Sequence, residues 1–148
     1  MKLVAPPGWK RPSGYSNGVI ENGLLFVSGQ VGWDETGAFS PDLVQQIRQA
    51  LRNICTVVQA AGAKPDQIAR LTWYVTDRKA YKSRLAEIGA AYREIIGRHF
   101  PAMSVVEVAG LVEDEAQVEI EATVAMSEVA STRGKRMLAA RISLPHSE

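Results

Sequence analysis

Cysteine and histidine are scarce in this sequence. Its 148 residues include one cysteine, Cys55, and two histidines, His99 and His146. One cysteine cannot form a disulfide within the chain, and these three residues lack the close spacing that zinc ligands show. We therefore expect no metal site and no cofactor, and we interpret Cys55 as a small core residue beside an apolar helix stripe.

Long apolar runs are also missing, and the net charge is small. No segment approaches the roughly 18 apolar residues of a membrane-spanning helix, and the N-terminus lacks the pattern of a signal peptide. The 17 Lys and Arg residues nearly balance the 16 Asp and Glu residues, so there is no basic excess to attract nucleic acid. The sequence thus predicts a cytoplasmic protein that binds neither membranes nor nucleic acid.

The length and the hydrophobic content of 46% are those of a single globular domain. We place this domain at residues 1–127. Within it, the proline-containing residues 1–13 are expected to form an extended N-terminal arm. Residues 128–148 are predicted to be a polar C-terminal tail.

Turn signals and alternation predict two strands near the N-terminus. Asn22-Gly23 is a typical hairpin turn, and it separates a short strand ending at Ile20 from a strand over residues 24–28. The second strand is apolar on both faces, which favours a central and buried position. Residues 29–37 follow as a loop with three glycines, which indicates tight backbone or close approach to another group.

Two helices are predicted from apolar residues at helical spacing. The first is expected to begin with Ser40 as the N-cap and Pro41 at the first helical position, and to end at Gly62. The second is expected to follow Asp77 as its cap and to run without a break to Gly97.

Three further strands are predicted from alternation. One covers residues 68–76, between the two helices, and the others cover residues 102–108 and 118–124. In the last strand apolar side chains face one way, whereas Glu119 and Glu121 face the other. Two carboxylates on one face of a central strand indicate a solvent-facing surface, a functional site or an interface.

The predicted element order is β-β-α-β-α-β-β, which is an α+β fold with a mixed sheet. Because crossover connections are right-handed, both helices are expected on one face of the sheet. If the alternation holds, the other face carries five residues: Glu119, Glu121, Met103, Val105 and Glu107. A bare face of this mixed character predicts burial against other copies of the chain.

Several separated motifs resemble one known family. They include Pro-Ala-Met-Ser-Val-Val-Glu-Val at residues 101–108, Val-Glu-Ile-Glu-Ala at residues 118–122, Phe-Val-Ser-Gly-Gln at residues 26–30 and Val-Thr-Asp at residues 75–77. Taken in their order along the chain, they resemble the RidA family, also called YjgF/YER057c/UK114, over residues 14–125. The resemblance implies a chorismate-mutase-like α+β fold, a homotrimer and active clefts between subunits.

The resemblance also implies an activity. The best-known members hydrolyse reactive imines and enamines to keto acids and ammonia, and an arginine holds the substrate carboxylate. This chain has Met103 at the position of that arginine and Val105 at the position of a family cysteine, which implies an altered substrate choice. Glu119 matches the glutamate that positions or activates water, so it is the expected catalytic residue. Four residues are expected to contact the substrate: Tyr15, Gly29, Trp33 and Met103.

Each candidate has a structural alternative. In the alternative interpretation, Glu119 forms a hydrogen bond between subunits and Glu121 forms a salt bridge. Tyr15 is otherwise a packing residue, and Trp33 an interface anchor. If a cation replaces the missing arginine, three residues are available elsewhere in the sequence: Arg11, Arg84 and Arg93.

Three functions are therefore weighed. The first is a RidA-like deaminase of imines or enamines with altered substrate choice, of which aminomuconate-type deamination is one version. The second is a trimeric module that binds a small metabolite without catalysis. The third is ribonuclease action, which the lack of a basic, aromatic patch disfavours.

Overall fold

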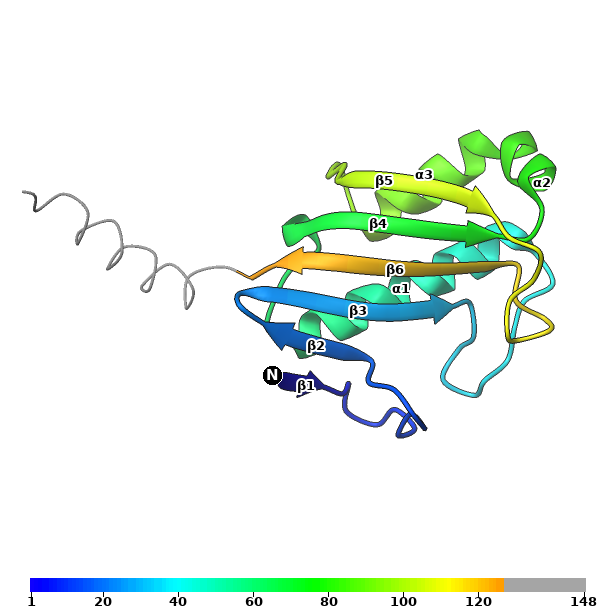
Figure 1. Ribbon diagram of the computed structural model, residues 1–148. Helices are drawn as coiled ribbons and strands as arrows, with labels where there is room; N and C mark the ends of the chain where they lie inside the picture. The colour runs from blue at the N-terminus through cyan, green and yellow to red at the C-terminus, as the bar shows by residue number, and fades with distance from the viewer. Residues whose placement is uncertain (127–148) are drawn as a thin grey trace, which may run out of the picture.

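The computed structural model describes residues 1–126 as one six-stranded sheet with helices packed against it (Figure 1). The strands lie in the order β1-β2-β3-β6-β4-β5. Their bounds are Lys2–Val4 (β1), Gly18–Glu21 (β2), Leu24–Val31 (β3), Ile68–Val75 (β4), Ala102–Glu107 (β5) and Val118–Ala125 (β6). The helices are Leu43–Ala60 (α1), Arg78–Ser83 (α2) and Leu85–Ile95 (α3), with a short 3-10 turn at Pro65–Gln67. The predicted tail, residues 128–148, lies outside the described residues.

The long helices α1 and α3 lie on the same face of the sheet, as right-handed crossovers predict (Figure 1). α1 packs against β3, β6 and α3, and the core between these layers includes Leu25, Ile47, Leu51, Leu71 and Trp73. β4 and β5 run parallel, whereas every other pair of neighbouring strands is antiparallel. The predicted α+β fold with a mixed sheet is therefore confirmed.

Helix α1 begins later than the sequence analysis predicts. Asp42, and not Ser40, is the N-cap, because the Asp42 side chain accepts a hydrogen bond from the backbone N–H of Gln45. The Ser40 hydroxyl instead accepts from the backbone N–H of Asp42 and so organises the turn before the helix. The prediction of Ser40 was wrong because two capping residues stand two positions apart, and either fits the pattern.

The single helix predicted after Asp77 is two helices, α2 and α3. Asp77 is the N-cap as predicted, and it accepts from the backbone N–H groups of Lys79 and Ala80. The break lies at Arg84, whose φ of −128° and ψ of 30° are not helical. Its guanidinium forms ion pairs with Asp42 at the start of α1 and with Glu87. These long-range contacts cannot be read from apolar spacing along one segment.

The expected N-terminal arm begins with a strand that the sequence analysis did not predict. β1 pairs antiparallel with β2 and so forms one edge of the sheet (Figure 1). Val4 is buried in the core, and the terminal ammonium group of Met1 forms an ion pair with Glu21. Two apolar residues beside a proline-rich segment do not by themselves predict a strand. β1 forms because the hairpin that follows offers β2 as a pairing partner.

The open face of the sheet, which the helices do not cover, carries both carboxylates of β6. It does not carry the three β5 residues that were predicted to lie beside them. Met103 stands opposite Leu71, and Val105 stands opposite Trp73. Because partners across a sheet share a face, Met103, Val105 and Glu107 lie on the helix-covered side. The prediction that these three residues join Glu119 on the bare face was wrong.

Strand β3 is central, but it is buried on only one face within this chain. Leu25 is fully buried, whereas Phe26 on the open face is 46% exposed. The expectation of burial on both faces is therefore wrong for the single chain. Apolar residues on both faces of a strand imply two covered faces, and one chain supplies only one of them.

Candidate functional site

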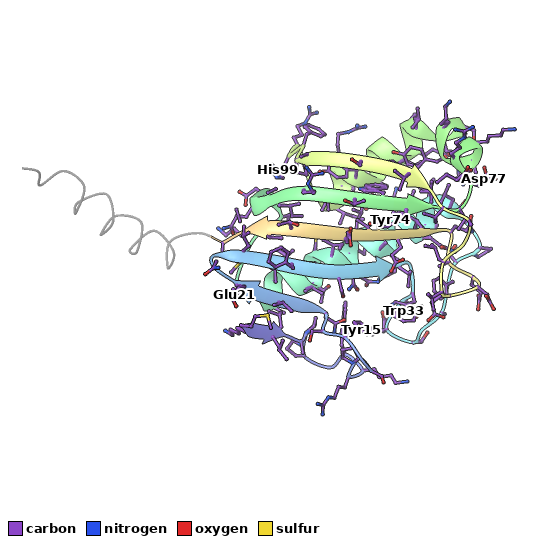
Figure 2. All side chains as sticks on the ribbon, viewed as in Figure 1. Tyr15, Glu21, Trp33, Tyr74, Asp77 and His99 are labelled. Atoms are coloured by element: carbon purple, nitrogen blue, oxygen red, sulfur yellow. The ribbon has the colours of Figure 1, made fainter. Side chains whose placement is uncertain are left out.

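Four of the five predicted site residues line one cavity at the end of β3. The cavity has a volume of about 330 Å³, and we call it the Glu119 hollow. Figure 2 shows Tyr15 and Trp33 near this end of the sheet. Its lining residues are Tyr15, Ser28, Gly29, Val31, Trp33, Val112, Glu113 and Glu119. The structure therefore brings Tyr15, Gly29, Trp33 and Glu119 together.

Gly29 makes room for the carboxylate of Glu119. A Cβ atom built on Gly29 would lie 2.2 Å from Oε1 of Glu119 and 2.7 Å from its Cδ atom. Gly29 has no positive φ, so it is the missing side chain, and not an unusual backbone, that matters here. The close approach predicted for this glycine-rich loop is therefore to Glu119.

A bulge in β3 creates this approach. The pairing of β3 with β6 shifts register between Val27 and Gln30, so Ser28 and Gly29 leave the regular ladder. The backbone N–H and the hydroxyl of Ser28 both donate to the carbonyl oxygen of Asn17. The side-chain amide of Gln30 donates to the carbonyl oxygen of Ser28 at 3.1 Å. These bonds fix the irregular backbone beside the carboxylate.

Asn53 on helix α1 holds the loop that carries Trp33. Its side-chain amide is buried and donates to the carbonyl oxygens of Val31 at 3.0 Å and Trp33 at 2.9 Å. Gly32 between them passes so close to the helix that an added Cβ would lie 2.6 Å from the carbonyl oxygen of Gln46. Asn53 is a positioning residue that the sequence analysis did not assign.

Gln46, also on α1, contacts the loop that leads into β6. Its side-chain amide donates to the carbonyl oxygens of Ser40 and Glu115, at 2.8 and 2.9 Å. Its Oε1 atom accepts from the backbone N–H of Gln117 at 2.8 Å. Gln46 is almost fully buried, and a polar residue within an apolar helical stripe was the sequence signal for such a role.

Glu119 is electrostatically unlike a surface carboxylate. Its pKa is raised above the ordinary value, first because burial removes water from the charged form and second because the negative charge of Glu121 opposes it. Tyr74 lies directly opposite Glu119 in the sheet and donates its hydroxyl to Oε1 of Glu121 at 2.6 Å. This hydrogen bond is the main reason that the pKa of Tyr74 is also raised.

Met103 does not line the Glu119 hollow. β4 separates its strand from β6, and its side chain lies on the helix-covered side with 39% of its surface exposed. Among the suggested replacement cations, Arg84 forms ion pairs with Asp42 and Glu87, and neither Arg11 nor Arg93 lines the cavity. Within residues 1–126, the lining of this hollow contains no Lys, Arg or His side chain.

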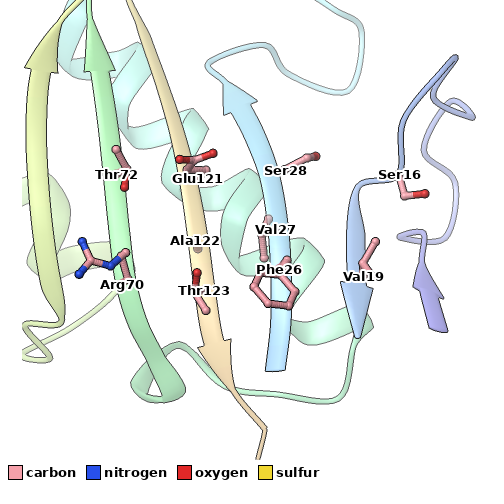
Figure 3. Close-up of a pocket in the computed structure, with 10 residues that line it drawn as sticks. All are labelled: Ser16, Val19, Phe26, Val27, Ser28, Arg70, Thr72, Glu121, Ala122 and Thr123. Carbon is pink, nitrogen blue, oxygen red and sulfur yellow. The ribbon is translucent and has the colours of Figure 1, made fainter. Parts of the chain in front are cut away.

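A second cavity lies on the open face of the sheet, beside Glu121 (Figure 3). This Glu121 hollow has a volume of about 370 Å³ and shares Ser28 with the first. Figure 3 shows its residues on β2, β3, β6 and β4 and, for Ser16, on the segment before β2; Phe26 lies on β3, and Arg70 and Thr72 lie on β4. It contains none of the residues predicted for catalysis or substrate binding.

Metal ligands do not gather anywhere in the described part of the chain. Among residues 1–126, no three His, Cys, Asp or Glu side chains are placed to hold a metal ion. Nor is any helix in that range long and apolar enough to cross a membrane. Cys55 packs against the core, and burial raises the pKa of its thiol to about 11. At neutral pH Cys55 is therefore a poor nucleophile.

The arrangement suits proton transfer to a small apolar molecule. A half-buried carboxylate with a raised pKa exchanges protons closer to neutrality than an ordinary glutamate. The Tyr15 hydroxyl lies in the same cavity, and Trp33, Val31 and Val112 supply apolar walls. A carboxylate in such a setting can accept a proton from water and return it to a bound molecule.

The space beside Gly29 gives a first prediction. We expect Gly29→Ala to lower the turnover of the chain's reaction about tenfold, because the new Cβ pushes the Glu119 carboxylate aside. The atom that must move is the end of a flexible side chain, so the fold should survive. Gly110→Ala is the matched control, since a Cβ at Gly110 has no atom within 4 Å. Equal turnover in both variants would contradict the assignment of Gly29.

The charge of Glu121 gives a second prediction. We expect Glu121→Gln to shift the acid limb of the pH–rate profile to lower pH, because it removes a negative charge that raises the pKa of Glu119. The other groups around Glu119 are Tyr74 across the sheet and Tyr15 and Glu113 in the cavity. Tyr74→Phe is the control: it removes the hydrogen bond but leaves the charge. An acid limb that stays in place in Glu121→Gln would contradict this coupling.

The chain is similar to several proteins of known sequence. A family model described as endoribonuclease L-PSP matches residues 9–126. The 2-iminobutanoate/2-iminopropanoate deaminase of Salmonella typhimurium is 38% identical over 112 residues, which cover 73% of this chain and 84% of that protein. A RutC family protein of Pyrococcus horikoshii is 34% identical over 110 residues, with coverage of 73% and 83%.

Solved structures show the same fold. The YjgF gene product of Escherichia coli has a TM-score of 0.75 at 33% identity, covering 86% of this chain and 100% of its own. Escherichia coli TdcF, crystallised with bound serine, has a TM-score of 0.74 at 30% identity and the same coverage. Both matches therefore cover most of this chain and the whole of each solved structure.

Proposed function

Because the chain belongs to the RidA (YjgF/YER057c/UK114) family, we propose that it is a deaminase that hydrolyses reactive imines or enamines and releases ammonia. One observation carries this proposal. The Glu119 carboxylate, with its raised pKa, sits against Gly29 in a small cavity that also contains a tyrosine hydroxyl. That arrangement suits the activation of one water molecule.

In the proposed reaction, water adds to the carbon of the C=N bond while Glu119 accepts one of its protons. Glu119 then returns that proton to the nitrogen, which gives a carbinolamine. In the second step Glu119 accepts the carbinolamine hydroxyl proton and delivers it to the nitrogen as the C–N bond breaks, so that the products are a carbonyl compound and ammonia. The raised pKa of Glu119 supports both steps, because a group that titrates nearer to neutrality accepts and donates more readily. In this proposal Tyr15, which lines the same cavity, hydrogen-bonds the substrate nitrogen or the water.

We propose that the working form is a homotrimer with the Glu119 hollow at a subunit interface. The open sheet face exposes Leu24, Phe26 and Val106, and Val112 at the rim of the hollow is 97% exposed. Apolar residues exposed in this way favour burial against another copy. We expect light scattering coupled to size-exclusion chromatography to give three times the chain mass at micromolar concentration. A monomer mass would contradict both the trimer and the shared cleft.

The activity is tested by ammonia release from a panel of imines generated in situ by amine and amino acid oxidases. We expect rates above the uncatalysed hydrolysis for at least one class of imine. Ligand binding without faster ammonia release from any imine would instead favour a trimeric binding module. RNA cleavage has no support in the site, because carboxylates and not basic residues line the hollow.

A further inference from the structure

The charges that one chain contributes to the Glu119 hollow are all of one sign. Its ionisable lining residues are Glu119, Glu113 and Tyr15, and no positively charged side chain among residues 1–126 joins them. Two carboxylates without a cation repel a substrate that carries its own carboxylate. The same pair attracts a positively charged nitrogen, and a protonated imine carries its charge on that nitrogen.

The walls of the hollow suit the same kind of group. Trp33 and Tyr15 present aromatic rings, and Val31 and Val112 present apolar surface. Aromatic faces attract organic cations by about 0.5–2 kcal/mol, and Trp does so most strongly. A hollow lined by aromatic, apolar and carboxylate side chains therefore matches an apolar molecule with a cationic nitrogen.

An acidic loop borders the Glu119 hollow. The loop after β5 contains Glu113, Asp114 and Glu115, and the carbonyl oxygen of Glu115 accepts from the buried amide of Gln46. Arg84 does not line the hollow, and it forms ion pairs with Asp42 and Glu87. The acidic loop beside the hollow is thus tied to α1 through its backbone.

We propose that the Glu119 hollow recognises a cationic nitrogen group with no neighbouring carboxylate, so that the preferred substrates are imines derived from simple amines and not from amino acids. The reaction in this inference rests on the proposed deaminase function. The preference of the hollow for a cation does not depend on that function. The reaction balances as R₂C=NH₂⁺ + H₂O → R₂C=O + NH₄⁺. Water adds to carbon, the C–N bond breaks, and the positive charge leaves on ammonium. An aminomuconate-type substrate, which carries two carboxylates, is disfavoured.

Turnover is tested with two imines that differ only by a carboxylate. A flavin amine oxidase forms 2-phenylethanimine from phenethylamine, and an amino acid oxidase forms 2-imino-3-phenylpropanoate from phenylalanine. We expect the protein to accelerate ammonia release from the first at least about tenfold more than from the second, equivalent to about 1.4 kcal/mol. Equal acceleration, or a preference for the carboxylate-bearing imine, would overturn the inference.

Binding is tested separately, without catalysis. Calorimetry with phenethylammonium and 3-phenylpropanoate compares a cation and an anion of similar shape, and we expect only the cation to bind measurably. Glu113→Gln should weaken its binding about two- to fivefold, the usual worth of an exposed charge pair. Asp66→Asn, on the 3-10 turn outside the hollow, should leave it unchanged.

The turnover experiment and the binding experiment test the proposed function and the binding preference separately. Selective binding of the cation with no turnover of either imine would support the binding preference and overturn the deaminase. Tight binding of 3-phenylpropanoate would overturn the preference even if ammonia is released. An equal effect of Glu113→Gln and Asp66→Asn would show that overall charge, and not the hollow, attracts the cation.

Discussion

Glu119→Gln is expected to lower the rate of imine hydrolysis by about 10²- to 10⁴-fold, the usual contribution of one general acid–base group. Glutamine has nearly the same shape and fits the space beside Gly29, but it neither accepts nor delivers a proton at neutral pH. The measurement is ammonia release at saturating imine, compared with the uncatalysed rate. The loss should appear in kcat more than in KM, because the proton moves only during reaction.

The same variant should not lose stability. Because the pKa of Glu119 is raised in the fold, its charged form is less favourable there than in the unfolded chain. The ionised carboxylate therefore lowers stability above its folded pKa, and this cost disappears as the pH falls through that pKa. Glutamine is uncharged throughout, so we expect the Tm of Glu119→Gln at pH 7 to equal or exceed that of the wild type.

These two measurements decide the role of Glu119. Lost turnover with an unchanged mass and an unchanged or higher Tm supports the catalytic assignment. Unchanged turnover in an intact assembly would show that Glu119 is not the acid–base group. Lost assembly would favour the alternative in which Glu119 is a hydrogen-bonding group between subunits.

The faces of the strands could be predicted only where alternation is clear. β6 alternates strictly between apolar residues and Glu119, Glu121 and Thr123, and the predicted faces are correct. β5 carries Val105 and Val106 in succession, so its own sequence does not say which of them faces the core. The register with β4 decides that question, and register is a long-range property.

The candidate site, too, could be predicted only in part from the sequence. The sequence placed Gly29 and Glu119 together only through the family resemblance, since more than eighty positions separate them in the chain. The bulge in β3 and the buried amides of Gln46 and Asn53 shape the hollow, but their partners are backbone groups of distant loops. Sequence spacing cannot report such contacts, although a polar residue on an apolar helix stripe indicates that they exist.

Met103→Arg is expected to raise the hydrolysis of 2-iminopropanoate by about one to two orders of magnitude. A hydrogen bond to a charged group is worth about 1.5–3 kcal/mol, and about 1.4 kcal/mol corresponds to a factor of ten in rate. Wild-type protein, with methionine at this position and carboxylates in the hollow, should hydrolyse this imine poorly. The variant should shift preference toward carboxylate-bearing imines.

Because of where Met103 lies, the same experiment also tests whether the Glu119 hollow is completed by a second copy of the chain. In one chain, β4 separates its strand from β6, and its side chain is on the helix-covered side of the sheet edge. A new guanidinium there does not reach the Glu119 hollow of its own chain. A gain in activity therefore requires that β5 of one copy lies beside the hollow of the next, as the proposed trimer implies.

Met103→Lys is the matched control, because it adds the same charge without the planar fork that binds a carboxylate through two hydrogen bonds. We expect a smaller gain from Lys than from Arg, and a gain from Arg that disappears in samples diluted until the trimer dissociates. An equal gain from both would assign the effect to charge alone. No gain from either, in confirmed trimers, would mean that β5 does not border the hollow. In that case the hollow of a single chain would recognise the carboxylate-free imines, through its own Glu113, Trp33 and Glu119.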